Sequence, residues 1–186
     1  VDPAAFITLL SEKMQADGIY VADVGQNQIW SCGYHIVRDG KFLTSGGMGT
    51  MGFGLPAAIG ATFGAPGRMV CLFLGDGGIQ MTLQELGTIM EQRSPVKIIL
   101  LNNNYLGNVR QWQEMFFGKR YSFTPMMNPD YNMIASAYGI PNRTVVERED
   151  LAAAIQEMVD TDGPYLLQVA VIEEGRVLPM CCPGND

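Results

Sequence analysis

Apolar residues follow two alternating patterns along the chain. Short, nearly continuous apolar runs are typical of strands buried on both faces of a parallel sheet. They occur at 19–22, 69–74, 96–101, 144–146 and 166–171. Between them lie longer stretches with apolar residues three or four positions apart, which indicates helices. Strands alternating with helices predict an α/β fold, an open and mostly parallel sheet with helices on both faces.

The helical stretches and the segments that fit neither pattern can be placed by residue. Helices are predicted at 3–14, 55–63, 79–90, 109–115, 128–139 and 151–159. The 128–139 helix is expected to begin with Asn128 as N-cap and Pro129 at its first position, and to stop at Gly139. We expect the polar segment 23–45 to be irregular, and 46–54 has too many glycines for an ordinary helix.

Composition narrows the class of protein. The 186 residues are 47% hydrophobic and 17% charged, which excludes a disordered chain and suits one domain, 1–186, without repeats. The net charge of −7 argues against a nucleic-acid partner, and no apolar run is long enough to span a membrane.

The cysteines and the histidine indicate a reducing compartment and no zinc site. The four cysteines (Cys32, Cys71, Cys181 and Cys182) form no CxxC pair, and His35 is the only histidine. We expect reduced thiols and a cytoplasmic protein, and we assign His35 no function.

Candidate chemistry follows two neighbouring predicted strands. Gly75-Asp76-Gly77-Gly78 comes directly after the 69–74 run, and Asn102-Asn103-Asn104 directly after the 96–101 run. Ligands of parallel sheets bind at the carboxyl ends of strands. A carboxylate, an amide oxygen and backbone groups there suit the oxygen-only coordination of Mg²⁺. Either cluster alone fits better as a helix cap or a turn, but together they favour a cation site.

The spacing of these clusters carries a family resemblance. Gly75-Asp76-Gly77, 24 further residues and then Asn102-Asn103 resemble the magnesium and diphosphate motif of thiamine-diphosphate enzymes. Among these enzymes the chain resembles the C-terminal cofactor domain of the acetohydroxyacid (acetolactate) synthase family. The similar segments are 24–26, 45–58, 111–113 and 177–180. The resemblance implies the thiamine-diphosphate-binding fold and a chain that is part of a longer, three-domain protein.

The resemblance also implies roles for individual residues. The implied Mg²⁺ ligands are the side chains of Asp76 and Asn103 and the backbone carbonyl of Tyr105. The implied diphosphate-binding residues are Gly77, Gly78, Gly107 and Asn108, with Gln26 and Asn27 closing from the other side. The implied aminopyrimidine-binding residues are Gly49 and Met51. The implied substrate-channel residues are Val109 and Trp112, although Trp112 on its own would be read as a core residue.

Two positions depart from the family pattern. Asn27 stands where the family often has His, and Asn108 stands where Met is usual. The implied Mg²⁺ ligands are unaffected, whereas the departure at Asn108 affects the packing on the substrate side.

The activity implied by the resemblance needs more than this chain. The family decarboxylates pyruvate and joins the remaining two-carbon unit to a second 2-oxo acid, such as 2-oxobutyrate, in branched-chain amino-acid synthesis. The glutamate that protonates the pyrimidine belongs to the N-terminal domain of a second catalytic chain, and FAD binds mainly to a central domain. We therefore expect no catalytic acid or base here, an inactive isolated chain, a homodimer or larger assembly and a possible small regulatory subunit.

Two other functions stay open on the residues alone. Residues 47–52 match the G-x-G-x-x-G fingerprint of dinucleotide-binding oxidoreductases, but the preceding segment 41–44 is a weak strand candidate. A non-catalytic thiamine-diphosphate-binding module would carry the same motifs as the enzyme. An upstream pyrimidine domain with its glutamate would favour the synthase.

Overall fold

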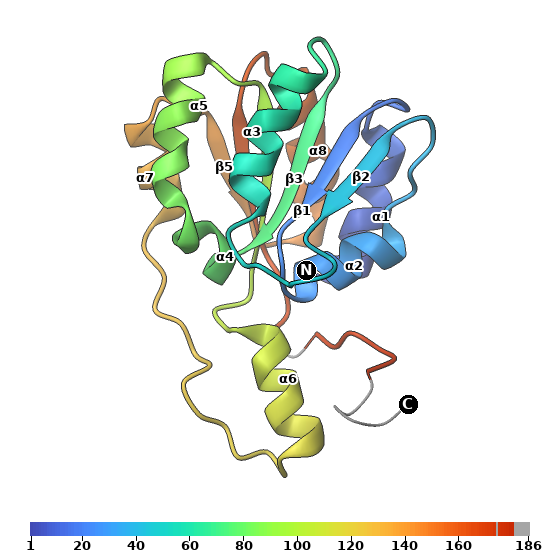
Figure 1. Ribbon diagram of the computed structural model, residues 1–186, viewed down its shortest axis with the longest axis vertical. Helices are drawn as coiled ribbons and strands as arrows, with labels where there is room; N and C mark the ends of the chain where they lie inside the picture. The colour runs from blue at the N-terminus through green and yellow to red at the C-terminus, as the bar shows by residue number, and fades with distance from the viewer. Residues whose placement is uncertain (174, 181–186) are drawn as a thin grey trace.

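The computed structural model describes residues 1–173 and 175–180, so Cys181 and Cys182 lie outside the described part. It contains a six-stranded, all-parallel sheet in the order β2-β1-β3-β4-β6-β5 (Figure 1). The strands are β1 (Ile19–Ala22), β2 (Lys41–Thr44), β3 (Val70–Gly75), β4 (Val96–Asn102), β5 (Asn142–Val145) and β6 (Tyr165–Ala170). The predicted fold class is confirmed.

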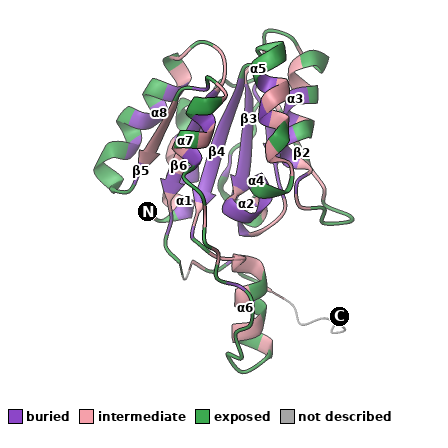
Figure 2. Ribbon diagram, turned by 90° about the vertical axis from the view of Figure 1, so that its left-hand side faces the viewer, coloured by how far each residue is buried: buried purple, intermediate pink, exposed green. Residues whose placement is uncertain are grey.

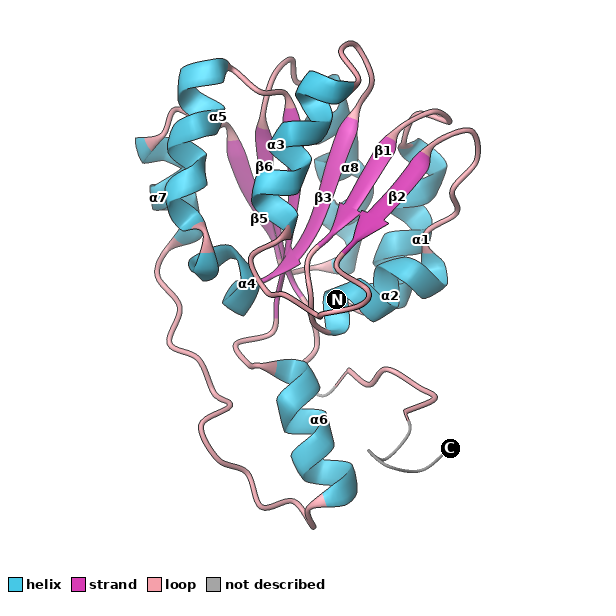
Figure 3. Ribbon diagram, viewed as in Figure 1, coloured by secondary structure: helices cyan, strands magenta, loops and turns pink. Residues whose placement is uncertain are grey.

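Helices cover both faces of the sheet (Figure 3). One face carries α1 (Pro3–Lys13), α2 (Gln26–Tyr34) and α8 (Leu151–Asp160). The other carries α3 (Gly54–Gly64), α4 (Asp76–Met81), α5 (Leu86–Gln92) and α7 (Tyr131–Ala137). In the part of the chain that the structure describes, no helix has both the length and the apolar character to cross a membrane.

The alternation of side chains along each strand divides the core in two. On β3, Cys71 and Phe73 pack towards α1 and α8, whereas Leu72 and Leu74 pack towards α3 and α5. All four are essentially inaccessible, and Figure 2 shows the central strands buried along their length. Burial on both faces explains why these strands are recognisable as continuous apolar runs.

Three local predictions were wrong. The segment 23–45 is not irregular, because it contains α2 and the edge strand β2. Helix α2 was missed because it buries polar residues, Gln26, Asn27 and Ser31 among them, that hydrogen bonds satisfy. Strand β2 was considered only as a weak candidate because one side of it faces solvent.

The other two errors concern helix boundaries. The 79–90 helix is divided into α4, the 3₁₀ helix η1 (Leu83–Glu85) and α5. Helix α7 begins at Tyr131, after Pro129, and its N-cap is Asp130, whose carboxylate accepts a hydrogen bond from the Met133 N–H. Asn128 is therefore not the cap, and its side chain is used elsewhere.

A buried carboxylate fixes the glycine-rich segment to the sheet. Asp23 follows β1 directly and is 1% exposed. Its Oδ1 accepts hydrogen bonds from the Gly52 N–H at 2.9 Å and the Gly54 N–H at 3.0 Å. Burial raises the pKa of Asp23, and the backbone N–H groups of Gly54 and Gly52 oppose the rise. The segment that leads into α3 is thus held at the carboxyl end of the sheet.

Helix α6 (Gly107–Phe116) extends away from the sheet and the helices that cover it, below the carboxyl ends of the strands (Figure 1). After α6 the chain runs back, and residues 124–126 lie alongside residues 104–106. The Leu106 N–H donates to the Thr124 carbonyl and the Met126 N–H donates to the Asn104 carbonyl, each at 2.8 Å. The segment that contains α6 therefore begins and ends beside the loop that follows β4.

His35 gives the fold a defined response to acid. The ring is 8% exposed, Ser11 Oγ lies 2.7 Å from Nδ1, and Nε2 has no hydrogen-bond partner among the residues 1–173 and 175–180. Burial, with a contribution from Arg38, lowers the pKa of His35 from 6.5 to about 4. Since the folded state binds its proton less readily than the unfolded state, we expect the free energy of unfolding to fall by up to about 3 kcal/mol as the pH drops from about 6.5 to 4.

Urea unfolding of wild type and His35→Phe at several pH values checks this expectation. The variant lacks the titrating ring, so the difference between the two stability curves isolates its contribution from that of the carboxylates. Parallel curves between pH 6.5 and 4 would contradict the assignment.

Replacing Asp23 by Ala should destabilise the fold by roughly 2–4 kcal/mol, because two backbone N–H groups lose a charged acceptor. Hydrogen exchange at Gly52 and Gly54 should accelerate in parallel. The control is Asp17→Ala, which removes an exposed partner 3.7 Å from Arg68 and should cost less than about 1 kcal/mol. Equal losses in the two variants would show that Asp23 does not hold the segment.

Candidate functional site

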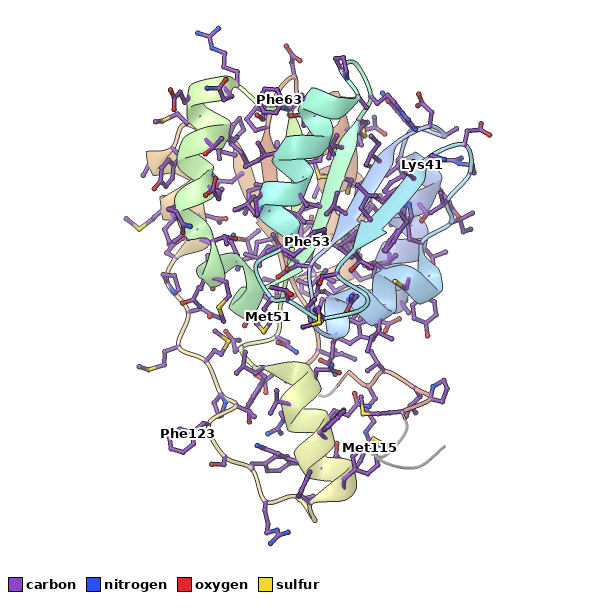
Figure 4. All side chains as sticks on the ribbon, in the orientation of Figure 1. Lys41, Met51, Phe53, Phe63, Met115 and Phe123 are labelled. Carbon is purple, nitrogen blue, oxygen red and sulfur yellow. The ribbon has the colours of Figure 1, made fainter. Side chains whose placement is uncertain are left out.

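A cleft opens at the carboxyl edge of the sheet, between the loops after β1 and β4 and the first residues of α4 and α6. Its lining residues are Val24, Gly25, Gln26, Asn27, Trp30, Met51, Gly75, Asp76, Gly77, Gly78, Leu101, Asn103, Tyr105, Leu106, Gly107, Asn108 and Val109. The structure thus brings together all the residues proposed from the sequence except Gly49 and Trp112. Figure 4 places Met51 at this edge, above α6.

Asp76 is the carboxylate of the cleft. It begins α4 directly after β3 and is 2% exposed. Its Oδ1 accepts from the Gly77 N–H at 3.1 Å, and its Oδ2 accepts from Asn128 Nδ2 at 2.7 Å. Burial raises the pKa of Asp76, while the hydrogen bond from Asn128 acts in the opposite direction. Each oxygen keeps a lone pair that could bind a cation.

Asn103 lies beside Asp76 because β3 and β4 are neighbours, with Gly75 in register with Leu101. Its Nδ2 donates to Gln26 Oε1 at 3.2 Å, and its Oδ1 accepts from the Tyr105 N–H at 3.1 Å. The amide of Asn103 is thereby oriented, with its oxygen on the Tyr105 side.

A chain of side-chain amides continues from Asn103 to the C-terminal segment. Gln26 Nε2 donates to Gln111 Oε1 at 3.1 Å and to the Gly175 carbonyl at 2.7 Å. Gln111 exchanges two hydrogen bonds with the backbone of Val177. The N–H groups of Gln26 are therefore engaged within the protein, as are those of Asn27, which donate to the Asp23 and Phe73 carbonyls.

Three glycines allow the backbone to come close to other groups around the cleft. A Cβ atom at Gly78 would overlap the Asp23 carboxylate, and one at Gly107 would overlap the Gln26 amide. At Gly77 it would lie 2.8 Å from Leu106 Cδ2 and 3.2 Å from Met51 Cε. Any side chain here would displace groups that are packed at or beside the cleft. Glycine is therefore required at these three positions by the close packing of the protein's own side chains.

The remaining predicted residues occupy more peripheral positions. Val109 is half-exposed on α6 and still lines the cleft. Gly49 is exposed and has a φ of +62°, which favours glycine. Trp112 is 38% exposed and packs edge-on against Phe116, with ring centroids 6.1 Å apart, so it is not a core residue.

Asn108 leaves an unmatched polar atom at the site. Its Oδ1 is buried and has no hydrogen-bond partner within the described residues. Buried polar atoms are normally paired, so this oxygen is free to accept a hydrogen bond from a ligand in the cleft.

Sequence reasoning missed three side chains that organise the site. Asp23 was assigned to an irregular segment, Gln111 was noted only as part of a similar segment, and Asn128 was taken for a helix cap. Asp23 had a detectable signal, because it follows a buried strand just as Asp76 does. Gln111 and Asn128 had none, since their contacts join positions distant in the sequence.

The donor set determines what the cleft can bind. The described residues contain no group of three His, Cys, Asp or Glu side chains placed to hold a metal ion. Asp76 instead lies among amide and carbonyl oxygens, which are ligands of hard cations such as Mg²⁺. This oxygen-only arrangement fits a hard cation and an anion bound to it, such as a phosphate ester.

Comparison with known proteins identifies related chains. The chain is 47% identical to the acetolactate synthase isozyme 2 large subunit of Escherichia coli K12, over 94% of this chain and 32% of that protein. It is 45% identical to the chloroplastic acetolactate synthase 1 of Nicotiana tabacum, over 100% of this chain and 29% of that protein. For the Lactococcus lactis large subunit the identity is 41%, over 99% and 32%. The chain spans about a third of the length of these relatives.

The topology disfavours the dinucleotide fingerprint at 47–52. Strands β2 and β3, which flank it in sequence, are separated in the sheet by β1, whereas the fingerprint belongs to a βαβ unit with an acid on the next strand. Residues 23–169 match the family model described as thiamine pyrophosphate enzyme, C-terminal TPP binding domain. The chain therefore belongs to the thiamine pyrophosphate enzymes and comprises their C-terminal cofactor-binding domain.

Proposed function

We propose that this chain is the cofactor-binding part of an acetolactate synthase, which condenses pyruvate with a second 2-oxo acid in branched-chain amino-acid synthesis. The observation that carries the proposal is the meeting of Asp76, Asn103 and Tyr105 in one cleft. Similarity to acetolactate synthase large subunits over nearly the whole chain supports this activity within the family.

Mg²⁺ is the cation that the donor set fits. Asp76 and Asn103 would bind it through side-chain oxygens, and Tyr105 through its backbone carbonyl. The diphosphate would lie against Gly77 and Gly78 on one side and Gly107 and Asn108 on the other. The presence of all four residues in the lining of the cleft that holds Asp76 and Asn103 supports this placement.

The chain's own share of the chemistry is binding and orientation. Gly49 and Met51 would hold the pyrimidine ring, with Met51 positioned over Gly77. The segment that carries them is fixed by the hydrogen bonds from Gly52 and Gly54 to Asp23. Bound thiamine diphosphate supplies a nucleophilic carbon and an electron sink for the decarboxylation.

Other parts of the proposal concern groups outside this chain. The cofactor FAD would bind elsewhere in the complete protein, and the N-terminal pyrimidine-binding domain of a second catalytic chain would supply the glutamate. The complete protein would assemble as a homodimer or larger oligomer and could bind a small regulatory subunit. The substrates would be pyruvate and 2-oxobutyrate. A cytoplasmic location is consistent with the free thiols of Cys32 and Cys71, whereas the tobacco relatives are chloroplastic.

Asp76→Ala in the complete protein should weaken thiamine-diphosphate binding in the presence of Mg²⁺ by roughly 3–5 kcal/mol, because a buried charge partner of the cation is lost. Calorimetric titration with the cofactor measures the change. Asp130→Ala is the matched control, since it removes a carboxylate that caps α7 and does not line the cleft. Unchanged affinity in Asp76→Ala would mean that Asp76 serves only to begin α4.

Trp112→Leu should reduce the preference for 2-oxobutyrate over pyruvate as acceptor, because a large flat side chain can contact the extra methyl group. One methylene in an apolar pocket gives roughly 1–3 kcal/mol of discrimination. The product ratio under competing substrates measures the effect, and pyruvate decarboxylation should be largely retained.

The control for Trp112 is Phe117→Leu, an exposed aromatic residue at the end of α6. It should leave the ratio unchanged. A constant ratio in Trp112→Leu, accompanied by loss of folding or cofactor affinity, would make Trp112 a structural residue.

A further inference from the structure

Asn128 joins the two segments that carry the proposed cation ligands. Its Nδ2 lies 2.7 Å from Oδ2 of Asp76, the first residue of α4. The same nitrogen lies 3.1 Å from Oδ1 of Asn102, the last residue of β4, and 3.2 Å from Oδ1 of Asn104 in the loop that follows. One amide group thus donates to both segments from a third part of the chain.

The orientation of this amide is fixed from its oxygen side. Gln80 Nε2 donates to Asn128 Oδ1 at 3.1 Å and to the Tyr131 hydroxyl at 3.0 Å. The Tyr131 hydroxyl in turn lies 2.9 Å from the Asp76 carbonyl and 3.1 Å from Asn128 Oδ1. With the Gln80 N–H group on its oxygen, the Asn128 amide places its nitrogen towards Asp76. Asn128 is therefore a hydrogen-bond donor to the carboxylate and not itself a cation ligand.

The backbone delivers Asn128 to this position. Residues 124–126 pair with 104–106 through two hydrogen bonds and an antiparallel bridge between Tyr105 and Pro125. Asn128 follows this paired segment directly and is half-buried. Capping of α7 does not explain its presence, because Asp130 performs that function.

We propose that Asn128 is a positioning residue of the divalent-cation site: by holding Asp76 Oδ2 and linking it to Asn102 and Asn104, it sets the direction and spacing of the ligand oxygens. The inference rests on the proposed function. Hydrogen-bond partners of metal ligands commonly change metal affinity 10–100-fold when they are removed.

The test compares variants of the complete protein by calorimetric titration of Mg²⁺ at saturating thiamine diphosphate. Asn128→Ala should weaken the apparent Mg²⁺ affinity roughly 10–100-fold. Asn128→Gln retains an amide and should recover a large part of the loss. Asn132→Ala is the matched control, because it removes a hydrogen bond from α7 to Thr144 on β5 and makes no contact with Asp76. Its Mg²⁺ affinity should equal that of wild type.

Melting temperatures without cofactor separate positioning from folding. Asn128→Ala and Asn132→Ala should melt at similar temperatures although only the first loses affinity. If Asn128→Ala does not fold, Gln80→Leu decides, because it removes the donor that orients the Asn128 amide. It also removes the hydrogen bonds to the Tyr131 hydroxyl and the Asp76 carbonyl, but it leaves the hydrogen bonds to the Asp76 carboxylate oxygens in place. An intermediate loss of Mg²⁺ affinity in Gln80→Leu supports the proposal, and wild-type affinity overturns it.

The failures of the two proposals are distinguishable. A wild-type protein without Mg²⁺-dependent thiamine-diphosphate binding overturns the proposed function, and this inference with it. A wild-type protein that binds, with Asn128→Ala binding equally well, overturns only the role of Asn128.

Discussion

The carboxylate of Asp23 is the constraint on which the functional edge depends. A glycine-rich segment has little tendency to keep one conformation, since glycine loses more backbone entropy on folding than any other residue. Asp23 offsets this cost by accepting hydrogen bonds from Gly52 and Gly54 within the core. Its carboxylate also lies where a side chain at Gly78 would be. One buried charge therefore fixes the positions of Met51 and of the loop after β3 relative to each other.

Parallel pairing accounts for the other half of the site. Neighbouring parallel strands must end at the same edge, and β3 and β4 therefore place Asp76 and Asn103 in one cleft. Strand pairing alone leaves side-chain orientation undefined. That orientation comes from amides on other elements, Gln26 for Asn103 and Asn128 for Asp76. The strands provide proximity, and the long-range amide contacts provide direction.

The sequence predicted features that depend on local pattern. The buried strands and the placement of Asp76 and Asn103 follow from continuous apolar runs and from what comes directly after them. It failed for α2, whose buried Gln26 and Asn27 give no apolar periodicity, and for β2, which is half solvated at the edge. Asn128 was misassigned because Asn before Pro is typical of a helix start. Its real partner, Asp76, is 52 positions away, beyond any local rule.

The choice of amides around Asp76 has an electrostatic consequence. An arginine in place of Asn128 could hold the carboxylate equally firmly, but it would neutralise the charge that a cation needs. The Asn128 amide orients the carboxylate through a hydrogen bond and leaves its formal charge uncompensated. Burial of that charge is costly, as the raised pKa of Asp76 indicates. On the proposed function, a bound divalent cation would relieve the cost, so the same burial that disfavours the empty carboxylate would favour the bound state.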